Sequence, residues 1–236
     1  MRTYNLVVTD VTRYGTLYCV AGWDLQNGGM IRPEPPTAVA TIESTRFWTN
    51  RDAGPGRFFS VGNIVRFEAQ DAPANFPFPH ATEDRIAVNP DNSAVVGHMT
   101  LLQVTQAVEP GLSTSIPVAF GNQLHVASSG KAYVTLGSQT NSLGAIEIDS
   151  QTIAFYENAP KPGKRQLRAM IYQNGSGYDL SAPADAALDR FFAGGIAALQ
   201  ADAKASKKIH VRLGLSRPFP AMPTSCYAQI NGLYFL

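Results

Sequence analysis

Turn-forming residues recur along the whole chain and set the strongest limit on what it can fold into. The sequence has 20 Gly and 16 Pro among 236 residues. Gly and Pro are the two poorest helix formers, so long helices cannot dominate. Hydrophobic residues make up 44% of the chain and charged residues 16%, which excludes a disordered chain and a coiled coil. The sequence therefore predicts a β-rich globular protein.

The first half alternates short apolar runs with turns. Residues 27–29 (Asn-Gly-Gly) are a hairpin signal, and a loop rich in Pro, Thr, Arg and Gly follows at 35–57. Strands are expected at residues 4–9, 17–23, 30–31, 64–68 and 98–108. The first three of these predict a β-meander.

The second half is expected to carry the one main helix of the chain. Apolar residues recur at helical spacing over residues 184–203, although Gly194 and Gly195 weaken this helix. Strands are expected at residues 131–136, 145–156, 165–172, 209–215 and 226–235. Three strands, a helix and two strands are the order of the five-stranded Greek-key OB barrel.

These patterns predict a mainly β protein with two domains, the second of which is an OB-like Greek-key barrel. Gly, Pro and Ser concentrate between residues 108 and 130, where we place the boundary. The first domain is expected over residues 1–118. The second is expected over 119–236 and contains the helix at about 184–203.

Charge is distributed unevenly along the chain. The net charge is +1, which gives no support for general coating of a nucleic-acid duplex. Residues 71–160 carry two basic and eight acidic residues, whereas 161–217 carry ten basic and four acidic residues. Two interpretations are open: charges scattered by chance, or a basic face in the C-terminal half that meets an anion.

The cysteines and the N-terminus predict a cytoplasmic protein that does not enter a membrane. Cys19 and Cys226 lie in apolar, strand-like stretches and are expected to be reduced and buried. Charged residues interrupt the N-terminal segment, and no window reaches eighteen apolar residues.

Motifs for catalysis and metal binding are not found in the sequence. His80, Glu83 and Asp84 are metal-ligand types, but they have no second cluster with metal-site spacing. The chain has no nucleophile elbow and no phosphate-binding loop. We therefore expect a protein that is not an enzyme and has no cofactor or metal; an enzyme acting on a nucleotide is a lesser alternative.

Two cationic positions in the first half are candidates for nucleic-acid binding. Arg32 follows a strand and precedes a proline, so it is expected to emerge at a barrel rim and meet a phosphate or a base. The alternative is an ion pair with Glu34 or Asp24. Arg46 and Trp48 combine a cation and an aromatic ring in the long loop; alternatively, the aromatic residues of this loop cap the barrel.

A basic run opens one strand of the second half. Lys164, Arg165 and Arg168 are candidates for a phosphate-tracking groove, with Tyr172 and Tyr178 as stacking surfaces. Strand alternation places Arg165 on the face opposite Arg168. The alternative is a solvated strand edge whose charges prevent pairing with other strands.

Several short strings occur together in a fixed order. They are residues 19–22 (Cys-Val-Ala-Gly), 29–33 (Gly-Met-Ile-Arg-Pro), 142–144 (Ser-Leu-Gly), 178–180 (Tyr-Asp-Leu), 213–219 (Leu-Gly-Leu-Ser-Arg-Pro-Phe) and 226–227 (Cys-Tyr). This order resembles the dual-OB domain family of prokaryotic conflict-system proteins. Met30 stands where that family usually has Trp.

The resemblance implies two OB-like Greek-key barrels, over residues 1–118 and 119–236. It further implies a non-catalytic, sensor-type module that binds single-stranded or structured nucleic acid. It also implies a prokaryotic defence setting, in which other defence-system proteins are further partners. The rival hypothesis is a protein-interaction scaffold within a multi-component complex.

Overall fold

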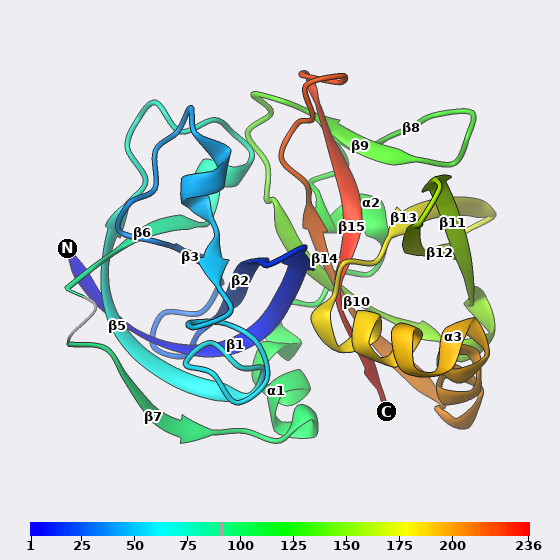
Figure 1. Cartoon of the computed structure of the whole chain (residues 1–236), viewed down its shortest axis with the longest axis horizontal. Helices are drawn as coiled ribbons and strands as arrows, with labels where there is room; N and C mark the ends of the chain where they lie inside the picture. The colour runs from blue at the N-terminus through cyan, green and yellow to red at the C-terminus, as the bar shows by residue number, and fades with distance from the viewer. Residues whose placement is uncertain (90–91) are drawn as a thin grey trace. The chain divides into compact units, whose positions relative to one another are not determined.

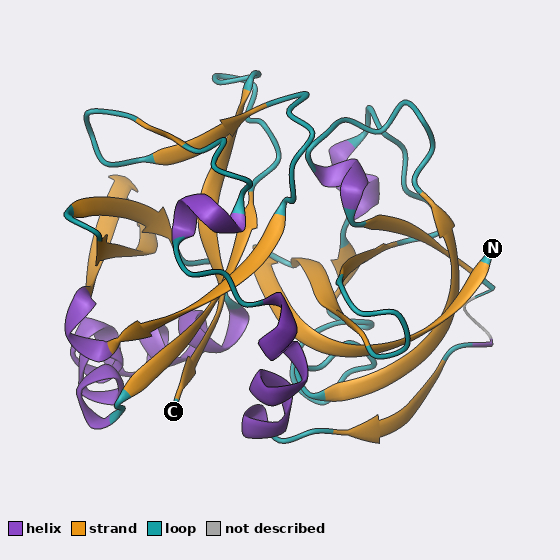
Figure 2. Ribbon diagram, turned by 180° about the vertical axis from the view of Figure 1, so that it is seen from behind, coloured by secondary structure: helices purple, strands orange, loops and turns teal. Residues whose placement is uncertain are grey.

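The computed structural model describes residues 1–89 and 92–236. The chain divides into two compact units, Met1–Gly111 and Leu112–Leu236. The expected boundary after residue 118 falls inside a short helix of the second unit, α2 (Ile116–Ala119). Strands predominate in both units (Figure 2). Among the described residues, no helix has the length and apolar character needed to cross a membrane.

The first unit is a closed five-stranded barrel with additions. Its elements are β1 (Arg2–Tyr14), β2 (Leu17–Asp24), β3 (Met30–Glu34), η1 (Glu43–Arg46), β4 (Trp48–Thr49), β5 (Asn63–Asp71), η2 (His80–Thr82), β6 (Asp84–Val88), β7 (Ala94–His98), α1 (Leu101–Val108) and η4 (Glu109–Gly111). The strands pair in the order β1-β2-β3-β6-β5, and β5 pairs back with β1. The β3–β6 pair is parallel.

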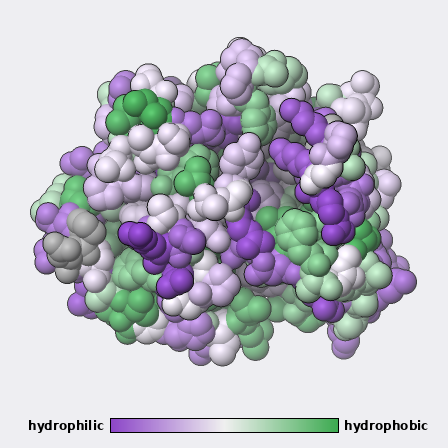
Figure 3. Space-filling view, viewed as in Figure 1, coloured by the Kyte–Doolittle hydropathy of each residue, from purple (hydrophilic) through white to green (hydrophobic). Residues whose placement is uncertain are grey.

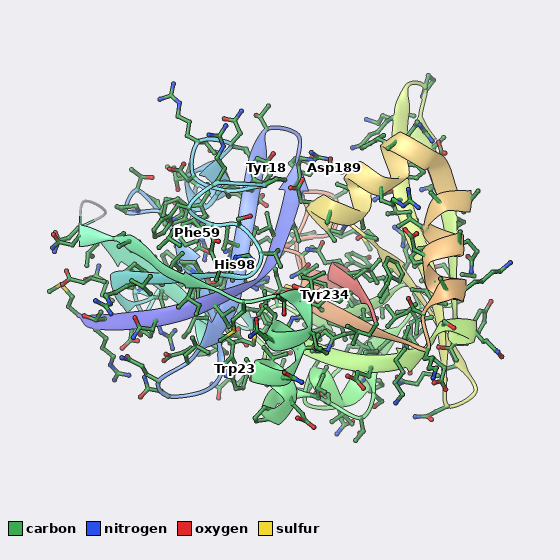
Figure 4. All side chains as sticks on the ribbon, turned by 90° about the horizontal axis from the view of Figure 1, so that it is seen from below. Tyr18, Trp23, Phe59, His98, Asp189 and Tyr234 are labelled. Atoms are coloured by element: carbon green, nitrogen blue, oxygen red, sulfur yellow. The ribbon has the colours of Figure 1, made fainter. Side chains whose placement is uncertain are left out.

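Alternation along these strands fills the first barrel. Leu6, Val20 and Phe67 point inward from three different strands and are almost fully buried. Tyr18 and Phe59, both labelled in Figure 4, belong to the same core. The residues between these positions therefore point to the outer side of the barrel.

The second unit repeats this pairing scheme and adds a hairpin. Its elements are α2, β8 (His125–Val126), β9 (Ala132–Thr135), β10 (Leu143–Asp149), η5 (Ser150–Thr152), β11 (Ile153–Lys161), β12 (Lys164–Gln173), β13 (Ser176–Ser181), α3 (Asp185–Ala205), β14 (Lys208–Leu215) and β15 (Ser225–Phe235). The order is β10-β14-β15-β13-β12-β11, and the β13–β15 pair is parallel. Because η5 alone separates β10 from β11, these two strands act as two halves of one barrel strand. The β8–β9 hairpin joins β15, as Figure 1 shows.

The two-barrel prediction is confirmed in its architecture. Two strand predictions are wrong, and a third predicted strand is present but lies outside the barrel. The run 98–108 is mostly the helix α1, because Thr100 and Gln103 form a capping box at its start. The predicted strand 145–156 is interrupted by η5. The third strand of the second barrel is β13, which we did not predict, and the predicted strand 131–136 belongs to the added hairpin.

The predicted main helix is present as α3, but glycine breaks it. Gly195 has φ 68° and ψ −169°, a region that residues other than glycine essentially never occupy. Beyond it, Asp202 accepts a 2.6 Å bond at Oδ2 from Nε of Arg190. A straight helix would separate residues twelve positions apart by about 18 Å. The helix therefore bends sharply at Gly195.

Candidate nucleic-acid interface

Arg32 points outward from β3, but it is not exposed. Its neighbour Ile31 joins the barrel core, so alternation sends Arg32 to the outer side. Only 3% of Arg32 is exposed, and its Nη1 donates to Oδ1 of Asp84 at 2.7 Å. Asp84 lies opposite Arg32 in the parallel β3–β6 pair. The prediction that Arg32 is available at a rim is therefore wrong.

Arg46 completes a buried network on the same outer face. Its Nε donates to Oε2 of Glu34 at 3.0 Å, and its Nη2 donates to the second oxygen of Asp84. Its guanidinium carbon lies 4.2 Å from the ring centre of Phe76. We call Arg32, Glu34, Arg46 and Asp84 the ion network. Arg46 is as buried as Arg32, so the expectation that it is exposed in the loop is also wrong.

Electrostatics hold the guanidinium group of Arg32 in its charged form. Burial, the largest single influence, would lower the pKa of Arg32, but the charges of the surrounding acidic groups, Asp84 first, together outweigh it and the net pKa is raised. Cys19, Glu83 and Glu34 add smaller contributions in the same direction. The network thus matches the ion-pair alternative for Arg32, with Asp84 as the direct partner.

Trp48 has an internal role in the same unit. Its indole Nε1 donates to the backbone oxygen of Pro33 at 2.8 Å, and its ring centre lies 4.7 Å from that of Phe59. Trp48 and Phe58 are partly buried against the barrel core. These contacts fit the alternative in which aromatic residues of the loop cap the barrel.

The second unit carries a different arrangement on the outer face of β11, β12 and β13. Arg168 Nε donates to Oδ1 of Asp179 at 2.8 Å and to the hydroxyl of Tyr156 at 3.0 Å. The Tyr156 hydroxyl also donates to Oδ1 of Asp179. Only 9% of Arg168 is exposed. Arg168 therefore holds three strands together, and its predicted role as a free phosphate contact is wrong.

The same contacts set the protonation of this group. Burial would lower the pKa of Arg168, but the hydrogen bond and charge of Asp179 raise it overall. Burial, followed by the hydrogen bond to Asp179, raises the pKa of Tyr156. At neutral pH the group is therefore an Arg–Asp ion pair with a neutral phenol.

The outer face around Arg168 and Asp179 carries solvent-exposed side chains. Tyr172 is 58% exposed and lies on the same face of β12 as Arg168, four residues further along the strand. Lys161 and Lys164 face each other where β11 meets β12. Both are exposed, and neither has an ion-pair partner within the described residues. We call Tyr156, Lys161, Lys164 and Tyr172 the open face.

Arg165 and Tyr178 are not part of the open face. Arg165 makes a two-pronged ion pair with Glu157 at 2.8 and 2.9 Å, and its guanidinium lies 4.5 Å from the ring centre of Phe191. The hydrogen bond from Arg165 lowers the pKa of Glu157. Arg165 therefore lies opposite Arg168, as alternation predicts. Tyr178 is 6% exposed in the core, so its predicted stacking role is wrong.

The two units also differ in charge. Met1–Gly111 holds eight basic and eleven acidic residues, whereas Leu112–Leu236 holds eleven basic and seven acidic residues. The net charges are −3 and +4.

The face seen in Figure 3 mixes hydrophilic and hydrophobic residues without one broad apolar area. Within residues 1–89 and 92–236, no group of three or more His, Cys, Asp and Glu is placed to hold a metal.

Sequence reasoning missed Tyr156 and an aromatic row on β8, β9 and β15. Tyr156 lies in a predicted strand, and its partner position on β12 is Arg168. The row includes Tyr133 and Tyr227, each flanked by buried residues of the core. A Tyr between two apolar residues of a strand, at both Tyr133 and Tyr227, is the sequence signal that could have found this row.

Both barrels have the same order of strand pairing. The outer face is sealed in the first barrel and open in the second. Together the two barrels define a tandem OB-fold protein. The chain belongs to the family described as Dual OB-containing domain, which it matches over residues 5–233. A comparison with curated protein sequences finds no match. One similar solved structure is titled "Structure of murine DNA binding protein bound with ds DNA". It has 8% identity and a TM-score of 0.31, and the alignment covers 100% of this chain and 94% of that one.

Proposed function

We propose that this chain is a non-catalytic nucleic-acid-binding module whose ligand lies on the open face of the second unit. OB barrels commonly bind oligonucleotides on their second and third strands and on the adjoining loops. In the second unit these strands are β12 and β13. The turn that joins β11 to β12 corresponds to the first of those loops.

The observation that carries this proposal is that exposed aromatic rings and lysines occur on one face. Among the described residues, these lysines have no ion-pair partner. Tyr172 offers an exposed ring on β12. Tyr156 on β11 is 36% exposed and lies opposite Arg168, four residues along β12 from Tyr172. Lys161 and Lys164 stand at the end of the same two strands. Single-strand binders combine such rings, which stack on bases, with cations that follow the phosphates.

Salt dependence tests the proposal. A fluorescently labelled 15-nucleotide DNA and the matching RNA are titrated with the full chain at 50 and 200 mM salt. Phosphate contacts should make the logarithm of the binding constant fall linearly with the logarithm of salt, by about 0.7 per contact for a single strand. Binding that is absent at the lower salt, or that is insensitive to salt, would overturn the proposal.

A second candidate function, a protein-interaction scaffold, is supported by exposed apolar side chains of the first unit. Val95 and Val96 on β7 are 48% and 45% exposed, and Leu101 and Leu102 on α1 are 47% and 58% exposed. A protein partner on this surface should survive high salt, because apolar burial does not depend on released counterions. The same salt series therefore separates the two functions.

The biological setting is a further part of the proposal. We place the module in a prokaryotic defence or conflict system, together with other proteins of that system, because of the family resemblance. Deleting the chain from its host should then lower resistance to phage or plasmid DNA. Unchanged resistance would contradict the proposed defence setting and would leave the proposed nucleic-acid binding unaffected.

A further inference from the structure

Three aromatic rings form a row across neighbouring strands of the second unit. His125 on β8 lies opposite Tyr133 on β9, and Tyr133 lies opposite Tyr227 on β15. The ring centres are 5.3 Å apart in the first pair and 5.7 Å apart in the second. The interplanar angles are 31° and 51°. We call His125, Tyr133 and Tyr227 the aromatic row.

The aromatic row faces outward. Ala132 and Val134, which flank Tyr133, belong to the core, as does Cys226 next to Tyr227. Alternation therefore sends Tyr133 and Tyr227 to the outer side of the sheet. His125 is exposed and both tyrosines are half-buried.

The row continues the surface that carries the open face. Arg168 lies opposite Ser181 on β13, and Ser181 lies opposite Gln229 on β15, two residues from Tyr227. Two residues along a strand return to the same face. A path across the strands thus runs from Tyr156 to the aromatic row on one side of the sheet. Figure 1 shows β9 beside β15 along this path.

The charge next to the row is suited to a nucleic-acid backbone. Lys131 immediately precedes β9, is exposed, and lies opposite Asp179 in a parallel bridge. The carboxylate of Asp179 is already engaged by Arg168. Lys131 therefore adds a cation to a surface on which the carboxylate of Asp179 is already paired with Arg168.

We infer that the aromatic row is a stacking platform for unpaired bases, so the ligand is single-stranded where it crosses β8, β9 and β15. This inference rests on the proposed nucleic-acid-binding function. In a duplex the faces of the bases are covered by their neighbours in the stack, so these rings could reach only the backbone and the groove edges. An unpaired strand can lay successive bases on aromatic rings while its phosphates meet lysines.

Three probes of matched length test the inference: a deoxythymidine 10-mer, an abasic 10-mer, and a 10-base-pair duplex. The abasic strand keeps the phosphates and removes the bases. The thymidine strand should bind about 5- to 150-fold more tightly than the abasic strand for each stacked base. Equal binding of the two strands would overturn the inference and leave phosphate binding intact. If none of the probes binds, the proposed function itself fails.

Substitutions in the aromatic row test whether its three rings cause the preference for the thymidine strand over the abasic strand. Tyr133→Leu and Tyr227→Leu should reduce the preference for the thymidine strand over the abasic strand, and Tyr133→Phe should retain it. His125→Ala changes an exposed side chain and should reduce the preference in a chain of unchanged melting temperature. Tyr14→Leu is the control, since Tyr14 is a 65% exposed tyrosine of the first unit. Leu variants that melt earlier but keep the preference would show that the rings only pack the sheet, and would overturn the inference.

Discussion

The two barrels share one order of strand pairings but use the outer side of their strands in opposite ways. In the first unit, Arg32 points outward from β3 and is sealed by Arg46, which η1 contributes from the loop that follows β3. In the second unit, Arg168 pairs with Asp179 on a neighbouring strand, and Tyr172 beside them stays exposed. Strand pairing alone therefore does not decide whether an OB face is available to a ligand.

The connecting segments account for the difference. Between β3 and β5 the first unit has a long loop, and η1 in this loop supplies the guanidinium that fills the outer face. At the same place in the pairing scheme, between β13 and β14, the second unit has α3. This helix packs against β11 and β15. The connection in the first unit closes the outer face. The connection in the second unit braces the barrel and leaves the outer face of β12, with Tyr172, exposed.

The largest expected effect comes from breaking the ion network. Asp84→Ala leaves Arg32 and Arg46 buried without a shared carboxylate, which should lower the free energy of unfolding by about 3–5 kcal/mol. Both Trp residues, Trp23 and Trp48, belong to the first unit. Urea unfolding followed by tryptophan fluorescence therefore reports this loss directly.

The control for this variant is Asp71→Ala, because Asp71 pairs with Arg85 while 69% of its side chain is exposed. That change should cost at most about 1 kcal/mol. Oligonucleotide affinity per folded molecule should be unchanged in both variants. A loss of affinity with Asp84→Ala would mean that the first unit also contacts the ligand.

Acid should destabilise the second unit through His210. Burial, together with the charge of Arg212, lowers the pKa of this histidine from 6.5 to about 3. Its Nδ1 lies 4.0 Å from Glu147, and its ring stacks on Tyr234. The folded chain therefore leaves His210 neutral, whereas the unfolded chain protonates it as pH falls below about 6.5.

Stability should accordingly fall by about 3 kcal/mol between pH 7 and pH 4 from this group. Far-UV circular dichroism of α3 during urea unfolding measures it. His210→Gln should flatten the dependence on pH even if its stability at pH 7 is lower. An unchanged slope in this variant would show that other groups carry the acid sensitivity.

Gly195→Ala should destabilise the second unit and leave the first unit unaffected. The backbone at Gly195 has φ 68° and ψ −169°, and a Cβ there should cost about 1–3 kcal/mol. Circular dichroism should show the loss, and the tryptophan transition should stay in place. If Gly195→Ala does not destabilise the chain, α3 can straighten, and the ion pair between Arg190 and Asp202 is then dispensable.

The smallest expected effect on stability comes from the open face. Replacing both Lys161 and Lys164 with Ala should change the free energy of unfolding by no more than about 0.5 kcal/mol. It should weaken oligonucleotide binding and reduce the salt slope by about 1.4, or 0.7 for each lost contact. The matched control replaces Lys204 and Lys207, which follow the bend of α3, and should leave the slope unchanged. Equal effects of the two pairs would point to net charge rather than to a site.

Sequence patterns predicted the fold better than the site because the fold depends on short-range signals. Alternation and turn residues located most strands of both barrels, and helical spacing located α3. The role of Arg32 depended instead on Asp84, which is 52 residues away. The parallel β3–β6 pair that joins them leaves no signal in either strand alone. The sequence placed Arg32 at a rim and offered Glu34 or Asp24 as ion-pair partners, whereas its direct partner is Asp84.

The open face shows the same limit. Alternation predicted that Arg165 and Arg168 lie on opposite faces, and the structure agrees. The assignment of Tyr178 failed because β13 was not recognised as a strand, so its inward-facing positions were unknown. The row of His125, Tyr133 and Tyr227 required the register of the β8–β9 hairpin against β15, which is far from the hairpin in sequence.

The interruption of one strand by η5 has a consequence for how the second barrel moves. In the first unit, β1 pairs with both β2 and β5 and so ties the whole barrel wall together. In the second unit, β10 pairs with β14, β11 pairs with β12, and the three residues of η5 lie between them. Two sections of wall joined in this way can open at separate free energies. The section formed by β11 and β12 can thus open while β10 and β14 remain paired.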